Sequence, residues 1–293
     1  MSDACAICGE SDWSHAYDGP IRDGVFGRQR PGRVRRCGAC FVEVLVEPAQ
    51  PPEEYYAEGT YRSDVGEQPD IEHFFERHDH EQFRQFPLLQ RLTVRHKRIA
   101  DVGCGGGSFL DGLAGYAEET IAIEPARSYH ASLIGRGHRV FPDVASASEA
   151  WGGRMDLVVC FSVIEHVADP VSLLHGIHGL LAPGGTALIS TPNRGDILLA
   201  AGCEPYRQFF YRVVHRFYFE DRSLRRAAAR AGFQSCDIVY RHRFGFSNFV
   251  GWLTEGRPLG DERSALLDRR FDSHWRLALE HEGRADYLYA YLS

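Results

Sequence analysis

The sequence has no long hydrophobic run, and none of its apolar stretches approaches the roughly 18 residues that a membrane-spanning helix needs. Its N-terminus lacks the basic and then apolar order of a signal peptide, so we expect a cytoplasmic protein. An excess of positive charge is also missing, since the formal net charge is −7. This charge disfavours nucleic acid as a partner, and the sequence offers no sign of a membrane partner.

Four of the eight cysteines form two pairs, Cys5-x-x-Cys8 and Cys37-x-x-Cys40. Thiols stay reduced in the cytoplasm, so clustered cysteines indicate a metal site rather than disulfides. Zinc prefers a tetrahedral set of thiolates, and a two-residue gap lets a tight turn present two sulfurs to one ion. We therefore predict a structural zinc module over residues 1–46, with an extended loop or hairpin between the pairs. Four protein thiolates leave no open position, which disfavours a catalytic or redox metal.

Six arginines lie between the two cysteine pairs: Arg22, Arg28, Arg30, Arg33, Arg35 and Arg36. They form either a nucleic-acid or phosphate-binding face or the solvated surface of a small domain. Few aromatic residues are interleaved with them and the whole chain is acidic, so the solvated surface is favoured.

A proline-rich stretch at 47–53 marks the end of this module. Residues 47–96 are predicted to be a linker and an N-terminal helical segment. Apolar residues recur at helical spacing from Ile71 to Leu89, which predicts a helix that packs on the core or folds over its mouth. The histidines of this helix, His73, His78 and His80, are expected on its solvated surface.

From Lys97 onward the sequence alternates between strand and helix patterns. Strands are predicted at 98–103, 119–124, 138–141, 156–162, 185–191, 234–240 and 285–292, and helices near 107–115, 126–135, 146–151, 170–181 and 223–231. Uninterrupted apolar strands such as 157–161 are typical of a parallel sheet buried on both faces. The pattern predicts a doubly wound, Rossmann-like α/β fold, with an aromatic insertion at about 194–221.

A glycine loop joins the first of these strands to the next helix, in Asp101-Val-Gly-Cys-Gly-Gly-Gly-Ser-Phe109. Its glycines permit φ values that a Cβ would penalise, and they leave bare backbone for a ligand at a helix N-terminus. Glu124 ends the following strand, near the roughly 20-residue spacing of an acid that holds a ribose hydroxyl. The loop therefore predicts a nucleoside-cofactor site. Ser108 replaces the third glycine of a dinucleotide loop, which disfavours an NAD-dependent dehydrogenase.

Four stretches together resemble class I S-adenosylmethionine-dependent methyltransferases: 101–109, 123–125, 156–170 and 181–193. Their order and spacing match that family from about 97 to 240. The resemblance implies a seven-stranded methyltransferase domain at 97–293 that binds S-adenosylmethionine. Residues 217–233 are similar to the branch with ubiquinone-type O-methyltransferases and sugar methyltransferases. A four-cysteine module followed by Tyr55-Tyr56-x4-Tyr61 is similar to deoxysugar C-methyltransferases.

The resemblance also implies roles for particular residues. Asp101, Gly103, Gly105 and Gly107 would line the methionine part of the cofactor, Glu124 would take both ribose hydroxyls, Asp143 and Val144 would hold the adenine, and Phe161 and Ser162 would bound the methyl-donor pocket. Tyr56 or Tyr61 would close over the cofactor from the N-terminal side, or would be ordinary packing residues.

Two histidines are candidates for the general base that a hydroxyl acceptor needs. His166 follows the fourth predicted strand, and His215 lies in the aromatic insertion, where a substrate lid would emerge. Glu165 is placed to orient either ring. The alternatives are a structural hydrogen bond that orders the loop for His166 and packing of the lid for His215. An acceptor that is already acidic would need neither residue as a base.

The sequence thus favours methyl transfer to a small molecule, at a hydroxyl or carbon of a sugar, a nucleotide-sugar or another natural-product intermediate. One alternative is an rRNA methyltransferase with a zinc module, in which the arginine-rich loop binds RNA. The net charge and the aromatic insertion argue against it. The other alternative is a non-catalytic binding protein with a methyltransferase fold, against which the intact glycine loop and Glu124 argue.

Overall fold

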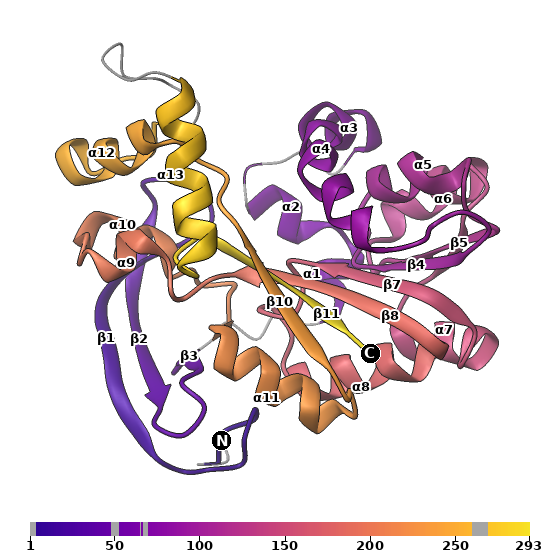
Figure 1. The fold of residues 1–293 in the computed structure, drawn as a ribbon, viewed down its shortest axis with the longest axis horizontal. Coiled ribbons are helices and arrows are strands. Elements are labelled where there is room, and N and C mark those ends of the chain that lie inside the picture. The colour runs from indigo at the N-terminus through magenta and orange to yellow at the C-terminus, as the bar shows by residue number, and fades with distance from the viewer. Residues whose placement is uncertain (1–3, 48–52, 65, 67–69, 260–268) are drawn as a thin grey trace.

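The computed structural model describes residues 4–47, 53–64, 66, 70–259 and 269–293 (Figure 1). Its centre is a seven-stranded sheet in the order β10-β11-β8-β7-β4-β5-β6. The strands are β4 (Arg98–Val102), β5 (Glu119–Ile123), β6 (Arg139–Phe141), β7 (Met155–Phe161), β8 (Leu181–Pro192), β10 (Cys236–Arg241) and β11 (Tyr287–Leu292). Strand β11 pairs antiparallel with β8 and with β10, whereas β4–β8 pair in parallel. The predicted fold class is confirmed.

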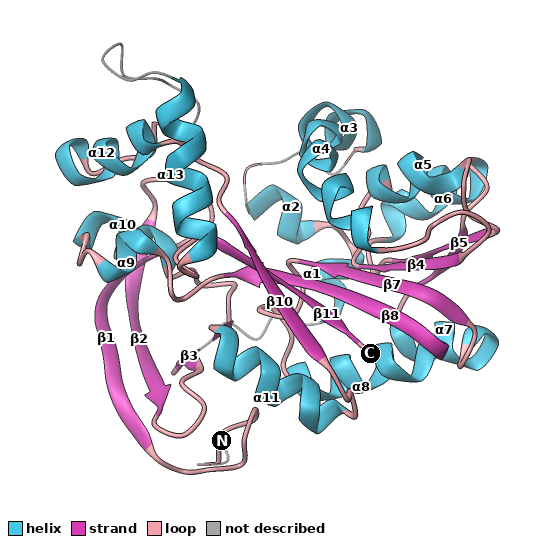
Figure 2. Cartoon of the chain, viewed as in Figure 1, coloured by secondary structure: helices cyan, strands magenta, loops and turns pink. Residues whose placement is uncertain are grey.

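Helices cover both faces of this sheet (Figure 2). They are α5 (Ser108–Ala114), α6 (His130–Gly135), α7 (Val144–Trp151), α8 (Pro170–Leu180) and α11 (Asp221–Ala231). Successive residues of β7 enter different cores, because side chains alternate across a strand. Val158 and Cys160 pack in the core beneath α7, α8 and α11, and Leu157 and Val159 pack in the core beneath α5 and α6. This burial on both faces explains why the strand has an uninterrupted apolar sequence.

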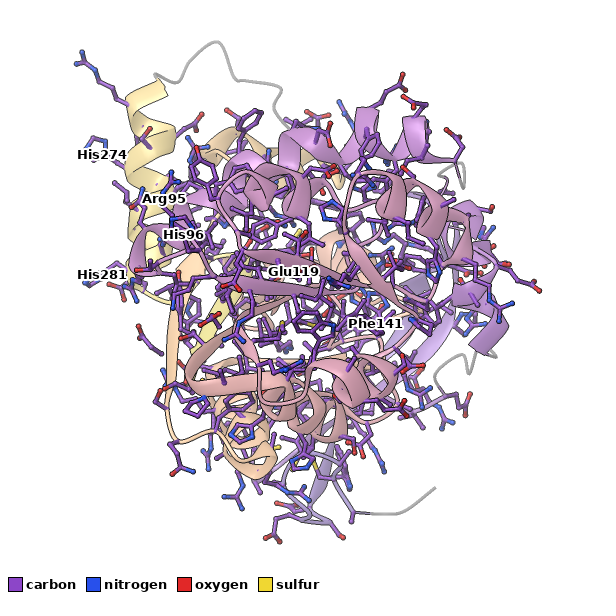
Figure 3. The ribbon with its side chains drawn as sticks, turned by 90° about the vertical axis from the view of Figure 1, so that its right-hand side faces the viewer. Arg95, His96, Glu119, Phe141, His274 and His281 are labelled. Carbon is purple, nitrogen blue, oxygen red and sulfur yellow. The ribbon has the colours of Figure 1, made fainter. Side chains whose placement is uncertain are left out.

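The parallel strands all point toward one edge of the sheet. Figure 3 shows Arg95 and His96, just before β4, on the side where the strands begin. Phe141, the last residue of β6, lies on the opposite side of the same view. Ligands of open α/β sheets bind at the carboxyl ends of the strands, which is the side of Phe141.

A second, four-stranded sheet contains the N-terminal residues, in the order β1-β2-β3-β9. A long hairpin of β1 (Trp13–Arg22) and β2 (Gln29–Cys37) is followed by β3 (Glu43–Leu45), and β9 (Phe217–Tyr218) comes from the insertion. The buried carboxylate of Glu43 accepts hydrogen bonds from Arg194 at 2.5 Å and from the Tyr211 hydroxyl at 2.7 Å. The N-terminal segment and the insertion, with its helices α9 (Ile197–Ala200) and α10 (Glu204–Phe210), therefore share one sheet and one core.

The prediction of one continuous helix from Ile71 to Arg91 is wrong. The structure has α3 (Ile71–His78) and α4 (Gln82–Gln85), separated and followed by 3₁₀ turns at 79–81 and 86–91. Pro87 lies in the second turn, where it cannot donate a backbone hydrogen bond. Two shorter helices precede this segment, α1 (Glu53–Ala57) and α2 (Thr60–Asp64).

Two further helices, α12 (Phe246–Glu255) and α13 (Arg269–His281), lie between β10 and β11. In Figure 3 the labelled His274 and His281 mark α13. No helix among the described residues combines the length and the apolar character needed to cross a bilayer.

Candidate active site

A cavity of about 600 Å³ opens where the parallel strands end. Its lining includes most of the residues predicted for the site: Tyr56, Tyr61, Asp101, Gly103, Glu124, Asp143, Val144, Phe161, Ser162 and His166. Gly105, Gly107 and His215 lie next to this lining rather than in it. The fold thus brings these residues from five separate segments of the chain to one hollow.

The glycines of the loop after β4 are required by the backbone itself. Gly103 has φ +76°, and a Cβ there would lie 2.5 Å from the Val163 side chain. Gly107 has φ +90° at the start of α5, and its Cβ would lie 2.5 Å from Leu133. Both positions need a left-handed conformation and close packing, which only glycine tolerates. The loop therefore leaves its backbone free of side chains at the wall of the cavity.

Glu124 braces this loop from the end of β5. One carboxylate oxygen accepts from the Gly105 amide at 2.7 Å and the other from the Ala126 amide at 2.8 Å. Burial raises the pKa of Glu124 above its usual value, and the two amides act in the opposite direction. Each carboxylate oxygen has a second lone pair. The group can therefore accept two further hydrogen bonds from adjacent ligand hydroxyls, as a ribose would offer.

Asp101, at the same edge, is 4% exposed and has no hydrogen-bond donor for its side chain among the described residues. Burial, and then the neighbouring charge of Glu124, raise the pKa of Asp101 to about 8. A buried carboxyl without a donor is costly unless a ligand supplies one. Asp101 and Glu124 together suit a cationic ligand that also bears a diol, and S-adenosylmethionine fits this description.

Asp143 has a local role that the sequence did not reveal. Its carboxylate caps α7, accepting from the Ser146 amide at 2.7 Å and the Ser146 hydroxyl at 2.9 Å. Such a cap satisfies one of the unpaired amides at a helix start. Both Asp143 and Val144 still line the cavity, so the start of α7 borders it on the side of β6.

Tyr61 and His166 both line the cavity. Their rings meet edge to face at 5.7 Å between centroids. The His166 Nδ1 donates to the Val214 carbonyl at 3.1 Å, which leaves Nε2 as a lone-pair acceptor. Burial, followed by the charge of Arg212, lowers the pKa of His166 to about 3. His166 is therefore neutral over the physiological pH range.

His215 lies behind His166, with 4.7 Å between the two ring centroids. It is buried, and its Nε2 lies 3.4 Å from an Arg212 guanidinium nitrogen. Burial, then Arg212, lower the pKa of His215 well below its ordinary value. Glu165, His166 and His215 bring their ligand atoms within 4.8 Å of one another, as in a metal site. The guanidinium that occupies the His215 nitrogen disfavours a divalent cation at this cluster.

Several lining residues were not predicted, and they come from α2, α3 and α4. Phe74 packs so close to the glycine loop that a Cβ on Gly105 would lie 2.6 Å from its ring. Arg62 and His78 also line the cavity, and His78 packs against Phe74 with 4.5 Å between ring centroids. The predicted solvated position of His78 is wrong. The helical periodicity of this segment was the one signal that it covers the site.

The four N-terminal cysteines form a compact cluster away from the cavity, with all sulfurs within 4.8 Å of one another. The Cys5–Cys40 and Cys8–Cys37 sulfur distances are 3.7 and 3.5 Å. Metal–sulfur bonds of about 2.3 Å in a tetrahedron place sulfurs about 3.8 Å apart, so the cluster fits zinc. The amides of Gly9 and Phe41, both at positive φ, close matching turns on the carbonyls of Cys5 and Cys37.

Comparison with known proteins is consistent with this geometry. Residues 75–237 match the family model described as a methyltransferase domain. A ubiquinone biosynthesis O-methyltransferase of Pseudomonas aeruginosa is 28% identical over 176 residues, which cover 55% of this chain and 75% of that protein. The protein of the same name from Azotobacter vinelandii is 32% identical over 142 residues, covering 44% of this chain and 60% of that one.

Among solved structures, a SAM-dependent methyltransferase from Archaeoglobus fulgidus has the same fold, with a TM-score of 0.50 at 16% identity. The match covers 74% of this chain and 93% of that one. The family match spans more than half of the chain and includes the glycine loop, Glu124 and the strands that carry them. The chain therefore belongs to the methyltransferase-domain family and is a class I S-adenosylmethionine-dependent methyltransferase.

Proposed function

We propose that this enzyme transfers the methyl group to a hydroxyl of a small molecule, such as a sugar, a nucleotide-sugar or another natural-product intermediate; a carbon acceptor is the second choice. The observation that supports this is the shared cavity. It is lined by Asp101, which has no hydrogen-bond donor among the described residues, by Glu124, which has lone pairs left to accept from a diol, and by His166, whose Nδ1 is held by Val214. Its volume suits a cofactor together with a small acceptor.

The donor half would be held by the predicted residues. Glu124 would accept from the ribose hydroxyls, Asp101 would face the cationic methionine part beside Gly103, and Val144 with Asp143 would border the adenine. When bound, S-adenosylmethionine supplies a methyl group already activated by its sulfonium. The protein's task is then to hold the acceptor in line and to exclude water, for which proximity supplies much of the rate. Tyr56, Tyr61, Phe161 and Ser162 would form the walls between donor and acceptor.

His166 is the candidate for the base that takes the hydroxyl proton, since it lines the cavity and its Nδ1 is fixed by Val214, which leaves Nε2 as the acceptor. His215 would act through His166 as a positioning residue. A low pKa makes His166 a weak base, but it guarantees that the lone pair is available at all working pH values.

Replacing His166 by asparagine is expected to lower kcat roughly 100-fold while leaving cofactor affinity within about twofold. In the wild type, kcat/KM for the acceptor at saturating cofactor should show no loss from His166 between pH 8 and pH 5.5, because its pKa of about 3 lies below that range. Rapid-quench or product-formation assays at several pH values would measure kcat of the variant and the pH dependence of kcat/KM in the wild type.

An inflection near pH 6.5 that disappears in His166→Asn would contradict the low pKa assigned to His166. An unchanged kcat in His166→Asn would contradict its role as the general base. His215→Asn should lower kcat less, because His215 lies behind His166 rather than in the cavity lining.

We also propose that the four cysteines hold one structural zinc ion. Cys37→Ser is expected to lose the ion, seen by elemental analysis as a fall from about one zinc per chain. The melting temperature should fall sharply, because zinc binding contributes directly to folding of such modules. Cys203→Ser, outside the cluster, is the matched control and should keep the zinc. Retention of zinc by Cys37→Ser would rule out this ligand set.

Calorimetric titration with S-adenosylmethionine, followed by a panel of hydroxylated acceptors with detection of S-adenosylhomocysteine, tests the function directly. Binding of the cofactor with turnover of a sugar or nucleotide-sugar is the expected result. Binding without turnover of any small molecule, but with methylation of RNA, would favour the rRNA alternative. That alternative is disfavoured by the pairing of hairpin arginines with acids, Arg28 with Asp23 and Arg36 with Glu220.

A further inference from the structure

Two arginines from distant parts of the chain lie side by side where the N-terminal hairpin meets the insertion. Arg22, the last residue of β1, forms an isolated parallel bridge with Arg212. The Arg22 amide donates to the Tyr211 carbonyl at 2.9 Å, and the Val213 amide donates to the Arg22 carbonyl at 3.0 Å. Residues paired in a bridge direct their side chains to the same face. The backbone therefore holds two positive side chains together.

Neither guanidinium makes an ion pair with an acid among the described residues, and the Nε atoms of both are buried without a hydrogen-bond partner. The buried Glu165 is the acid on which Arg212 acts, and the charge of Arg212 opposes the rise that burial causes in the pKa of that carboxyl. Arg22 stacks on the Phe209 ring at 3.9 Å, and Arg212 contacts His215. Burial, and then the charge of Arg212, lower the pKa of Arg22 to about 9. Burying like charges side by side destabilises the fold. Because the pKa of Glu165 is raised to about 7, this carboxyl is only partly ionised at neutral pH and offsets only part of the charge, so the arrangement favours a further anionic group.

The other arginines of the hairpin behave differently. Arg28 pairs with Asp23, Arg33 with Glu47, and Arg36 with Glu220. The Arg28 and Arg33 pairs lie at the surface, as expected for the solvated face that the sequence favours, whereas the Arg36 pair is partly buried. Arg22 differs from these three because it makes no such ion pair and instead stacks on Phe209 of the insertion.

Arg22 and Arg212 lie behind Tyr61 and His166, two residues that line the cavity. Arg212 contacts His215, which packs on His166, and His166 lines the cavity. The charge of Arg22 interacts with the hydroxyl of Tyr61, another lining residue. Arg212 lowers the pKa of both histidines. The two arginines therefore place positive charge behind the part of the cavity lined by Tyr61 and His166, where the acceptor would lie.

We propose that Arg22 and Arg212 form a binding site for an anionic group of the methyl acceptor, a carboxylate or a phosphate. The inference rests on the proposed function, because it assigns the charge of the substrate at that same site. Guanidinium groups match the planar, two-oxygen geometry of both anions. An anion between the two arginines neutralises the charge that depresses the pKa of His166, so a charged acceptor increases the basicity of the residue that serves it.

The experiment uses the full-length protein and three variants, Arg22→Gln, Arg212→Gln and the matched control Arg30→Gln. Arg30 lies in the same hairpin but is exposed. Melting temperature is measured without additive and with sodium phosphate or sodium acetate at equal ionic strength, with sodium chloride as reference. Turnover is compared for anionic and neutral acceptors of like size, glucose 1-phosphate against methyl glucoside and 4-hydroxybenzoate against phenol. Cofactor affinity is measured by calorimetry for every variant.

The wild type is expected to be stabilised by phosphate or by acetate relative to chloride, and the stronger of the two identifies the anion. Arg22→Gln and Arg212→Gln should lose this stabilisation, while Arg30→Gln keeps it. Without additive, both variants should melt at the same or a higher temperature than the wild type, because a like-charge contact is relieved. Arginines with a purely structural role would instead lower the melting temperature on replacement.

Among acceptors, the anionic member of a pair should have a kcat/KM roughly tenfold or more above its neutral counterpart, and Arg212→Gln should remove that preference. Equal turnover of neutral and anionic acceptors, or phosphate stabilisation that persists in both variants, would overturn the inference. Failure of the wild type to bind S-adenosylmethionine would overturn the proposed function alone, because the phosphate and acetate measurements do not depend on the cofactor.

Discussion

Glu124→Ala is expected to weaken S-adenosylmethionine binding on the order of 1000-fold, since it removes two charge-assisted hydrogen bonds to the ribose. The same change leaves the Gly105 and Ala126 amides without their acceptor, so the glycine loop also loses its brace. Both the lost ribose contacts and the loosened loop lower the affinity for the cofactor. Isothermal titration calorimetry with the cofactor, and with S-adenosylhomocysteine as a second ligand, would measure the loss.

Two controls separate ligand contact from damage to the loop. Glu124→Gln keeps one carbonyl oxygen for an amide but loses the charge, and it should retain the melting temperature better than it retains affinity. Glu118→Ala removes an exposed acid shortly before β5 and should leave binding unchanged. Affinity of Glu124→Ala within a fewfold of the wild type would refute the assignment of this carboxylate.

Asp101→Asn is expected to weaken cofactor binding and, at the same time, to stabilise the free protein. Because the pKa of Asp101 is raised to about 8, the carboxyl is largely protonated at pH 7 in the free protein. A cationic ligand favours the ionised form, so binding at pH 7 should release a proton and should strengthen as pH rises toward 8. Calorimetry in two buffers of different ionisation enthalpy would count the proton, and the count should fall in Asp101→Asn.

The raised pKa of Asp101 also predicts how the stability of the free protein changes with pH. Raising the pH strengthens cofactor binding but weakens the stability of the free protein. An aspartate whose pKa is higher in the folded than in the unfolded state makes the free protein less stable as pH rises from about 4 to about 8. Asparagine carries no such charge, so Asp101→Asn should remove this dependence and should gain on the order of 1 kcal/mol or more at pH 7. A lower melting temperature for Asp101→Asn at pH 7 would show that Asp101 is satisfied in the free protein.

Much of the cofactor domain could be predicted from local sequence. A strand such as 157–161 is apolar at every position because both faces of the sheet are covered, and this leaves a signal in the sequence itself. The turn glycines at 103, 105 and 107 are equally readable, since a left-handed φ excludes most other residues. These features depend on neighbours within a few positions along the chain, so the elements were placed with small errors at their ends.

Features that depend on contacts between distant segments were missed or misread. The segment from Ile71 to Arg91 has one helical periodicity, but packing over the glycine loop breaks it into short pieces. Phe41, rather than a glycine, takes the positive φ in the second cysteine turn, which composition could not reveal. The sequence offered His166 and His215 as equal candidates, and the fold sets one in the cavity wall and the other behind it.

The sequence by itself determined the strand and helix order, the glycine loop, the acid at Glu124 and the spacing of the four cysteines, because each is written in residues close together in the chain. The tertiary structure decided how β9 of the insertion completes the N-terminal sheet. It thereby decided which part of the insertion lies beside Arg22. Arg22 and Arg212 carry no local pattern that links them. Their charges meet because one backbone bridge joins two segments far apart in sequence, and among the described residues neither side chain makes an ion pair with an acid.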